Sequence, residues 1–203
     1  MEKTLLITGG CGFIGSHFID YIQDIEEVEK IINIDYLTYA AHLDNMHGYG
    51  DKVNFYAFDI CNIEQTRTLF DLHEPTHIVN FAAESHVDNC ISDAMPFIQT
   101  NICGTFNLLQ LAKEYGCERY IQISTDEVYG DLHTCNDYEF KETDILNPSS
   151  PYSASKASAD LLALSYYKTH KLPVMITRSC NNFGPRQHEE KLIPKVILNA
   201  LQD

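Results

Sequence analysis

Two side chains that could move a proton, those of Tyr152 and Lys156, lie four residues apart. Residues at this spacing share one face of a helix, so the phenol and the ammonium would lie together if the segment is helical. A nearby cation lowers the pKa of a tyrosine, and a phenolate can act as a general base towards a hydroxyl group. The pair alone is weak evidence, because surface tyrosines and lysines often occur at this spacing. Its meaning depends on the fold around it.

Three adjacent polar residues, Thr125, Asp126 and Glu127, come just after a predicted strand at 119–123, with Ser124 between. A simple oxidoreductase needs one hydroxyl beside a Tyr/Lys pair. Two further carboxyl groups supply an acid and a base, as an elimination of water requires. The alternative is a capping Asp/Glu pair that leads into a solvated loop. Because the residues end a predicted central strand, we favour the catalytic interpretation.

A glycine-rich segment, residues 8–15, lies between a predicted strand and a predicted helix. Gly9, Gly12 and Gly15 allow a tight turn and a close approach of backbone N–H groups to a pyrophosphate, which the helix N-terminus also attracts. The G-x-x-G-x-x-G spacing is typical of short-chain dehydrogenase/reductase proteins. A glycine turn without a ligand is the less favoured alternative, because the strand and helix context matches a dinucleotide site.

Two aspartates follow predicted strands. Asp35 comes 20 residues after Gly15, where a carboxylate can accept hydrogen bonds from ribose hydroxyls and repel a 2′-phosphate, which favours NAD over NADP. Asp59 could reach the adenine amino group or could cap the helix that follows it, and both interpretations stay open.

An alternation of short apolar runs and longer helical patterns must position these residues. The expected strands are residues 4–7, 31–34, 53–58, 78–81, 119–123 and 174–177. One expected helix begins near Phe13, and four others span about 63–72, 97–115, 152–170 and 193–201. This order predicts an α/β fold with a doubly wound parallel sheet, a Rossmann-type NAD-binding domain that spans residues 1–203 and carries the catalytic residues. The polar stretch 132–150 is expected to be a surface excursion.

Composition excludes several classes of protein. The 203 residues include 14 basic and 29 acidic side chains, a formal net charge of -15, so a nucleic-acid partner is not expected. No apolar run reaches the roughly 20 residues of a membrane span, so no membrane partner is expected. The 7 cysteines form no CxxC pair and the 9 histidines form no HExxH motif. We therefore expect reduced thiols, a cytoplasmic protein and no metal.

The sequence resembles a known family over essentially its whole length. The segments that carry the resemblance are residues 8–16, 81–88, 125–130, 152–156 and 181–187. They resemble the nucleotide-sugar 4,6-dehydratases, extended short-chain dehydrogenase/reductase proteins, and most of all those that act on dTDP-glucose. The resemblance implies an NAD-dependent hydro-lyase that oxidises C4 of a nucleoside-diphosphate glucose, eliminates water across C5 and C6 and returns hydride to C6. The product is a 4-keto-6-deoxy sugar.

The resemblance also implies roles for single residues. Tyr152, assisted by Lys156 and Thr125, would remove the C4 hydroxyl proton, Glu127 would remove the C5 proton, and Asp126 would protonate the departing C6 hydroxyl. The residues implied to bind NAD are Gly9, Gly12, Phe13, Ile14, Gly15, Asp35, Leu37, Thr38, Asp59, Ile60, Ala82, Ala83, Ser85, Thr100, Tyr152, Lys156 and Asn182. Those implied to contact the substrate are Ser85, Thr125, Asn181, Lys191 and Leu192. For Leu192 an ordinary place in a helix core is an equal alternative.

Two departures from the family pattern qualify these expectations. Cys11 stands where the family commonly has a small alanine, and could place a thiol near the pyrophosphate. The chain also stops at Asp203, before most of the expected C-terminal substrate-binding portion. The substrate nucleotide, dTDP or UDP, therefore stays open. The alternatives are a UDP-sugar 4-epimerase, which needs no paired carboxyl groups after Thr125, and a truncated, non-catalytic NAD-binding module. A homodimer through the two long helices is implied by the resemblance alone.

Overall fold

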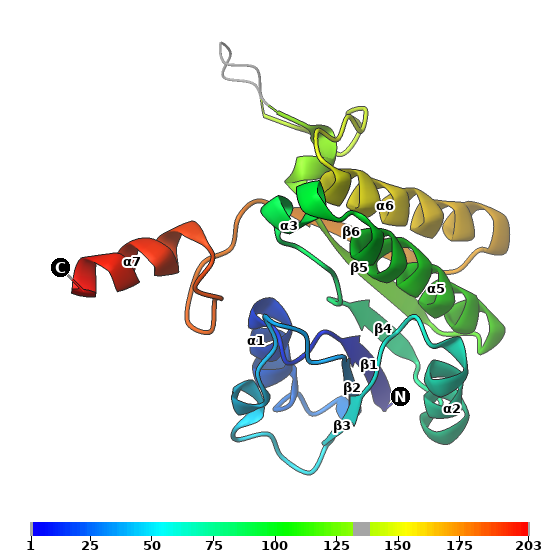
Figure 1. Cartoon of the computed structure of the whole chain (residues 1–203). Helices are drawn as coiled ribbons and strands as arrows, with labels where there is room; N and C mark the ends of the chain where they lie inside the picture. The colour runs from blue at the N-terminus through cyan, green and yellow to red at the C-terminus, as the bar shows by residue number, and fades with distance from the viewer. Residues whose placement is uncertain (1, 132–138, 203) are drawn as a thin grey trace.

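Six parallel strands form one sheet, in the order β3-β2-β1-β4-β5-β6. The computed structural model describes residues 2–131 and 139–202 (Figure 1). The strands are β1 (Lys3–Thr8), β2 (Val28–Asp35), β3 (Val53–Ala57), β4 (His77–Asn80), β5 (Arg119–Thr125) and β6 (Val174–Ser179). The sheet order reverses between β1 and β4, and in such a fold the crevice beyond the strand ends at the reversal is the usual ligand site. The predicted doubly wound parallel sheet is confirmed.

Two apolar layers hold helices against the two faces of the sheet. The helices are α1 (Phe13–Ile22), α2 (Ile63–His73), α3 (Val87–Ser92), α4 (Met95–Phe97), α5 (Thr105–Glu114), α6 (Pro151–His170) and α7 (Leu192–Gln202). Leu6 packs in one cluster with buried residues of α2, α5 and α6. Its neighbours Leu5 and Ile7 belong to the opposite cluster, with Ile19 and Ile22 of α1. Alternation along β1 thus assigns successive side chains to opposite layers.

The expected helix 97–115 is a composite. After α4 the chain continues as a π-helical segment, Ile98–Gly104, and then as α5. A Cβ on Gly104 would lie 2.5 Å from Cδ1 of Ile60, so this glycine lets the helix pack closely on the loop after β3. Short π segments are frequent at functional sites. The other expected elements are confirmed, whereas α3 and the 3₁₀ turns Leu43–Met46 and Asp126–Tyr129 were not anticipated.

The start of α6 is fixed by local chemistry. Ser150 and Ser153 form a reciprocal capping box and Pro151 occupies the first turn, as expected for a residue without an N–H. Before this helix, residues 139–150 form no regular element and lie at or near the surface. They confirm that part of the expected excursion, while residues 132–138 lie outside the described residues.

The last part of the chain is poorly covered. Along β6 half-buried and exposed residues alternate, and Met175, Thr177 and Ser179 are exposed. Helix α7 buries none of its described residues, and Figure 1 shows it extending away from the sheet. Within the described residues, no helix is both long enough and apolar enough to cross a membrane.

Candidate active site

A cavity of about 240 Å³ opens at the carboxyl ends of the strands. Many of the predicted cofactor residues line it: Gly9, Gly12, Phe13, Ile14, Gly15, Asp35, Thr38, Asp59, Ile60, Ala82, Ala83, Ser85, Thr100, Tyr152 and Lys156. The topology therefore gathers residues from the whole chain at one edge of the sheet.

The glycine loop is shaped by close backbone contacts. Gly9 has φ +72°, and a Cβ there would lie 2.8 Å from the backbone nitrogen of Ala82. A Cβ on Gly15 would lie 2.3 Å from the carbonyl oxygen of Gly9. Gly12, the residue before α1, has no side chain that could cap the helix. No side chain therefore caps the N–H groups of the first turn, beside the cavity that the loop lines. This cradle fits a pyrophosphate.

Asp35 fixes the loop from the end of β2. Its two carboxylate oxygens accept hydrogen bonds from the backbone nitrogens of Cys11 and Leu37, both at 2.8 Å. Burial raises the pKa of Asp35, and these two bonds lower it. Leu37, in the left-handed region at φ 56°, is not among the lining residues, whereas its neighbour Tyr36 is.

The expectation of a Cys11 thiol near a pyrophosphate is wrong. The side chain is fully buried, and its sulfur lies 3.4 Å from that of Met46 and 3.7 Å from the Asn33 amide nitrogen. Burial, helped by the charge of Asp35, raises the pKa of this thiol to about 12. Cys11 is a core residue because the loop turns its side chain inward.

Asp59 does not cap α2. Its carboxylate accepts from the backbone nitrogen of Cys61 at 2.8 Å, and Asn62 is the residue that caps α2, through Gln65. The capping alternative for Asp59 is therefore wrong. Asp59 and Ile60 line the cavity, as does Thr100 of the π-helical segment.

Thr125, Asp126 and Glu127 lie where β5 ends. The Thr125 hydroxyl accepts from the Glu127 backbone nitrogen at 3.3 Å and so begins the 3₁₀ turn Asp126–Tyr129. Burial and the charge of Asp126 raise the pKa of Glu127, while Lys191 opposes them. These residues do not line the cavity themselves, but Ser124 and Tyr152 beside them do.

Tyr152 lies in the first turn of α6 and is 9% exposed. Burial is the main cause that raises its pKa, the charge of Glu127 adds to it, and a hydrogen bond with Thr125 lowers it. The phenol is thus coupled to both ends of the polar trio.

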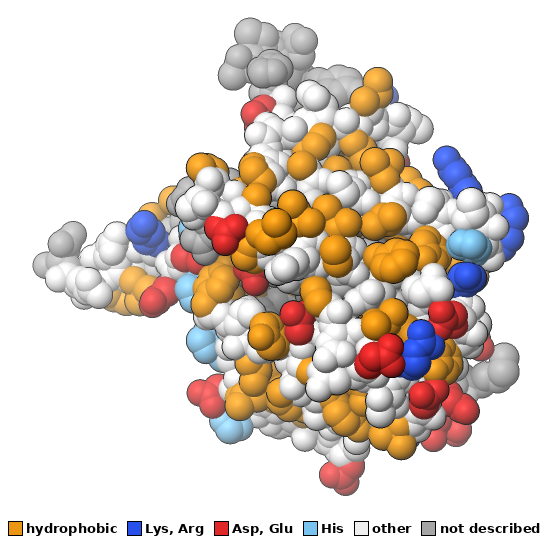
Figure 2. All heavy atoms as spheres, turned by 45° about the vertical axis from the view of Figure 1, so that its right-hand side comes forward, with side chains coloured by type: hydrophobic (Ala, Val, Ile, Leu, Met, Phe, Trp, Pro, Cys, Tyr) orange, Lys and Arg blue, Asp and Glu red, His pale blue; other side chains and the backbone are white. Residues whose placement is uncertain are grey.

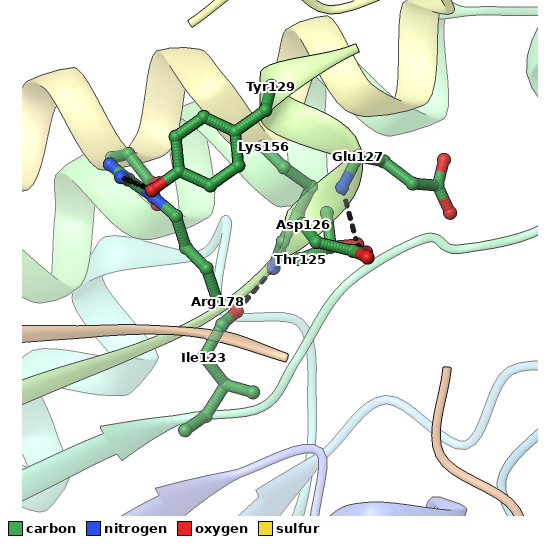
Figure 3. A network of polar contacts seen from close by, with 8 residues as sticks. Ile123, Thr125, Asp126, Glu127, Tyr129, Lys156 and Arg178 are labelled. Carbon is green, nitrogen blue, oxygen red and sulfur yellow. Dashed lines mark hydrogen bonds and ion pairs between the residues drawn. The ribbon is translucent and has the colours of Figure 1, made fainter. Parts of the chain in front are cut away.

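Lys156 is also buried, but it is directed at β5. Its Nζ donates to the carbonyl oxygen of Ile123 at 2.6 Å (Figure 3). Burial lowers the pKa of Lys156 to about 8, against the charge of Asp160. The sequence suggested that this ammonium lowers the pKa of Tyr152. In the structure the group that lowers it is Thr125, because Lys156 is engaged with the strand.

The residues expected on the substrate side are less gathered. Asn181 is exposed outside the cavity lining. Asn182, which was expected to bind the cofactor, is exposed and does not line the cavity either, and it donates to Ser179 Oγ at 3.1 Å and to Cys180 O at 3.2 Å. Lys191 Nζ donates to Ser85 O at 3.2 Å, which brings it to the cavity rim. Leu192 is 77% exposed, so its alternative place in a helix core is wrong.

Sequence reasoning missed several lining residues: Ile34, Tyr36, Ala40, Ala41, Phe58, Phe81, Glu84, Ile123 and Ser124. Glu84 and Phe81 lay within a segment that carried the resemblance, and that position was the available signal. Ser124 precedes the polar trio. Asn101, also missed, bonds the backbone of Glu84 in both directions and donates to Ser155 at 2.8 Å.

The sequence matches a known protein family. The family, described as GDP-mannose 4,6 dehydratase, matches residues 6–203. The chain belongs to this family. A relative from Haloferax volcanii, "Low-salt glycan biosynthesis protein Agl12", is 52% identical over 97% of this chain and 62% of its own length. The dTDP-glucose 4,6-dehydratase of Neisseria gonorrhoeae is 45% identical over 98% of this chain and 60% of its own length.

Solved structures of sugar-nucleotide enzymes have the same fold as this chain. The dTDP-glucose 4,6-dehydratase of Bacillus anthracis, in complex with NAD, has a TM-score of 0.88 and 46% identity, over 98% of this chain and 61% of that chain. A UDP-glucose 4-epimerase of Thermotoga maritima is more distant, with a TM-score of 0.83 and 30% identity over 93% of this chain and 59% of that chain. The chain thus spans about three fifths of the length of these relatives.

Proposed function

We propose that this protein is an NAD-dependent 4,6-dehydratase of a nucleoside-diphosphate glucose, with dTDP-glucose favoured and UDP-glucose possible. The observation that carries the proposal is the position of Thr125, Asp126 and Glu127. Thr125 ends β5 and the two carboxyl residues follow it, and Thr125 and Glu127 both act on the buried phenol of Tyr152. An acid for the C6 hydroxyl, a base for the C5 proton and an acceptor for the C4 hydroxyl proton thus adjoin one cavity, which is lined as a dinucleotide site would be.

NAD would occupy the cavity along the glycine loop. The first turn of α1 would meet the pyrophosphate, Asp35 the adenosine ribose, and Asp59 with Ile60 the adenine. Bound NAD would supply the acceptor for the hydride that leaves C4 and the donor of the hydride that returns to C6. Tyr152 and Lys156 at the far side of the lining mark the end at which the sugar reacts.

The first half of the reaction falls to Tyr152. The phenolate takes the proton of the C4 hydroxyl, and the Thr125 hydrogen bond stabilises the phenolate. Lys156 adds positive charge on the same helix and fixes the end of β5 through the Ile123 carbonyl.

The elimination falls to the two carboxyl groups. A 4-keto group acidifies the C5 proton, which Glu127 removes. The raised pKa of Glu127 makes it a stronger base than an ordinary carboxylate. Asp126 gives a proton to the departing C6 hydroxyl, which leaves as water. When hydride returns to C6, a proton returns to C5, which completes the 4-keto-6-deoxy sugar. Contacts to the nucleotide sugar remain proposals for Ser85, Thr125, Asn181, Lys191 and Leu192, and a contact to NAD remains one for Asn182. Lys191 has the best support, because it reaches the cavity rim at Ser85.

A 4-epimerase is the nearest alternative. It would use the same fold, NAD and the Tyr152–Lys156 pair, but it has no task for an acid and a base after Thr125. A non-catalytic NAD-binding module would need none of these side chains. The two carboxyl groups after Thr125 count against the epimerase, and the burial of Tyr152 and Lys156 beside them counts against the non-catalytic module.

We also infer a homodimer of cytoplasmic chains. Exposed apolar side chains occur on both long helices, among them Phe106 of α5 at 44% and Leu161 and Tyr167 of α6 at 59% and 53%. Figure 2 shows hydrophobic side chains gathered over the surface that these helices form. The described cysteines are all free thiols, which supports a reducing compartment. Light scattering of the purified chain tests the dimer, and Leu161→Glu should yield monomers.

The deciding experiment is mass spectrometry of the sugar nucleotide after incubation with dTDP-glucose or UDP-glucose, with and without added NAD. Loss of one water without net reduction of NAD supports the proposal and identifies the nucleotide. Inversion at C4 without water loss would establish the epimerase. NAD binding without any turnover would establish the binding module for this chain.

The variant Glu127→Gln tests the assigned base. It should lower water loss by at least about a hundredfold, because general-base contributions are of this order. NAD binding, measured by calorimetry, should be unchanged, and Glu142→Gln on the exposed segment before α6 is the matched control. Unchanged turnover in Glu127→Gln would contradict the mechanism.

A further inference from the structure

Asp160 is a buried carboxylate to which the proposed mechanism gives no task. It lies on α6 one turn after Lys156 and is 0% exposed. Burial raises its pKa, while the hydrogen bond from Arg178, the nearby Ser124 hydroxyl and the charges of Arg178 and Lys156 lower it. A buried carboxylate persists only when partners compensate for the lost hydration, so these partners indicate what Asp160 does.

Arg178 connects Asp160 to the polar trio. Its Nε donates to Oδ2 of Asp160 at 2.8 Å, and its Nη1 donates to the Tyr129 hydroxyl at 2.6 Å. The guanidinium carbon also lies 5.0 Å from the centroid of the Tyr129 ring. Tyr129 ends the 3₁₀ turn that begins directly after Thr125. One arginine on β6 thus joins α6 to the turn that carries Asp126 and Glu127 (Figure 3).

The second carboxylate oxygen of Asp160, Oδ1, is buried near Ser124. Oδ1 is buried without a hydrogen-bond partner of normal geometry among the described residues, and so is Oγ of Ser124. Ser124 is nevertheless near enough to lower the pKa of Asp160, and it lines the cavity. Asp160 therefore reaches from Arg178 on one side to the cavity wall on the other.

Asp160 also acts on Lys156. Among the described residues, the titratable and charged side chains around this part of α6 are Tyr152 and Asp160 on the helix, Arg178 on β6, and Asp126, Glu127 and Tyr129 after β5. Of these, Asp160 is the group whose charge raises the pKa of Lys156 against the effect of burial. Both side chains are buried and lie four residues apart, on one face of α6, while the hydrogen bond of Lys156 Nζ described here goes to the neutral carbonyl of Ile123.

We propose that Asp160 is a positioning residue of the candidate active site, which keeps Lys156 charged and, through Arg178 and Tyr129, fixes the turn that carries Asp126 and Glu127. The importance of Lys156 rests on the proposed function, but the two physical claims do not. Both can be measured without NAD, substrate or turnover, so their failure is distinct from the failure of the proposed function.

The first test follows the protonation of Lys156 by NMR. The chain carries lysine labelled with ¹³C at the ε position, and Lys156→Met assigns the signal. In Asp160→Asn the pKa of Lys156 should fall by about one unit, a tenfold lower proton affinity. Asp20→Asn is the matched control, because Asp20 also pairs with an arginine, Arg186, at 2.6 Å, but outside the candidate site. The control should leave the Lys156 signal unchanged.

A second variant covers the case in which Asp160→Asn does not fold, since it leaves Arg178 charged and partly buried. The double variant Asp160→Asn with Arg178→Gln removes both charges and should restore folding. Its Lys156 pKa should still be lowered, because the charge of Asp160 is absent. A Lys156 titration identical to that of the parent chain, in whichever variant folds, overturns the proposal.

The third test addresses the turn. Tyr129→Phe removes the hydroxyl that accepts from Arg178 and keeps the ring. Hydrogen exchange at the backbone amides of Glu127, Val128 and Tyr129 should accelerate about tenfold, the loss expected for one charge-assisted hydrogen bond. The titration of Lys156 should not change. Exchange at the parent rate overturns the claim that Arg178 fixes the turn.

Discussion

The interior strand β2, which adjoins the glycine loop, and the edge strand β6 differ sharply in how completely their side chains are buried. In β2 the five residues from Ile31 to Asp35 are all buried, and the strand ends on the carboxylate that fixes the glycine loop. In β6 exposed residues alternate with half-buried ones, and α7 after it buries no described residue. The described residues thus bury the side chains on the cofactor side of the cavity. On the proposed substrate side, they leave apolar side chains exposed.

This difference separates the two sets of site residues. Asp35, Gly9 and Gly15 are held by backbone contacts that leave them little freedom. Asn181 and Asn182 lie on exposed chain, and Lys191 reaches the site through one bond to Ser85. Cofactor binding should therefore respond to small changes in packing, whereas the proposed substrate contacts should tolerate them. The predictions below test this contrast in order of effect.

The largest effect is expected in the core. Leu6 is 0% exposed and packs in one cluster with buried residues of α2, α5 and α6. Leu6→Ala should therefore lower the free energy of unfolding by about 2–5 kcal/mol. Leu201→Ala on α7, where the leucine is 79% exposed, should change it by less than about 0.5 kcal/mol. Urea unfolding of both variants measures the contrast. Equal losses would show that α7 is as well packed as β1.

A smaller effect is expected from the glycine loop. Gly9→Ala adds a Cβ 2.8 Å from Ala82 N at a positive φ, which should cost about 1–3 kcal/mol of stability. NAD affinity, measured by calorimetry, should fall more than tenfold because the cradle shifts. Gly50→Ala is the control, since its Cβ would meet no atom within 4 Å. Normal affinity in Gly9→Ala would show that the loop adapts.

The ion pair that ties the late segment to α1 should contribute less. Arg186 and Asp20 are joined at 2.6 Å, with side chains 26% and 34% exposed. Such a pair is screened by solvent, so Asp20→Asn should change the free energy of unfolding by about 0–1 kcal/mol, and by less at high salt. Thermal unfolding at two salt concentrations checks this. A loss above about 2 kcal/mol would mean that the late segment is an integral part of the fold.

The smallest effect is expected from removing α7 altogether. A chain that ends at residue 191 loses no buried described side chain, so its melting temperature and NAD affinity should match those of the parent. Calorimetry of both chains decides it. A clear drop in either quantity would place α7 among the elements that support the cofactor site.

Local patterns in the sequence predict the fold and the cofactor side well. The glycine spacing and the position of Asp35 at the end of a strand depend on residues close together in the sequence, and the structure contains both. Partners that meet only in the folded chain were not predictable. Lys156 bonds a carbonyl 33 positions away, and Tyr129 receives a bond from Arg178 49 positions away. No periodicity encodes such pairings.

The same limit explains the errors at single residues. Cys11 fitted a thiol beside the phosphates, but the loop geometry turns it towards Asn33 and Met46, from distant elements. Leu192 fitted a helical core pattern, but a pattern cannot say whether anything packs on the helix.

The sheet order also sets a condition on how the chain is made. β1 emerges early in synthesis yet lies in the interior of the sheet, and its second neighbour β4 comes 72 positions later, as the bond between Thr8 and Asn80 shows. Closing so long a loop costs only about 0.6 kcal/mol more than closing one half as long. Until β4 leaves the ribosome, however, one side of β1 presents unpaired backbone groups on an apolar strand. The interval between completion of β3 and of β4 is therefore when a nascent chain is most exposed to aggregation and to capture by chaperones.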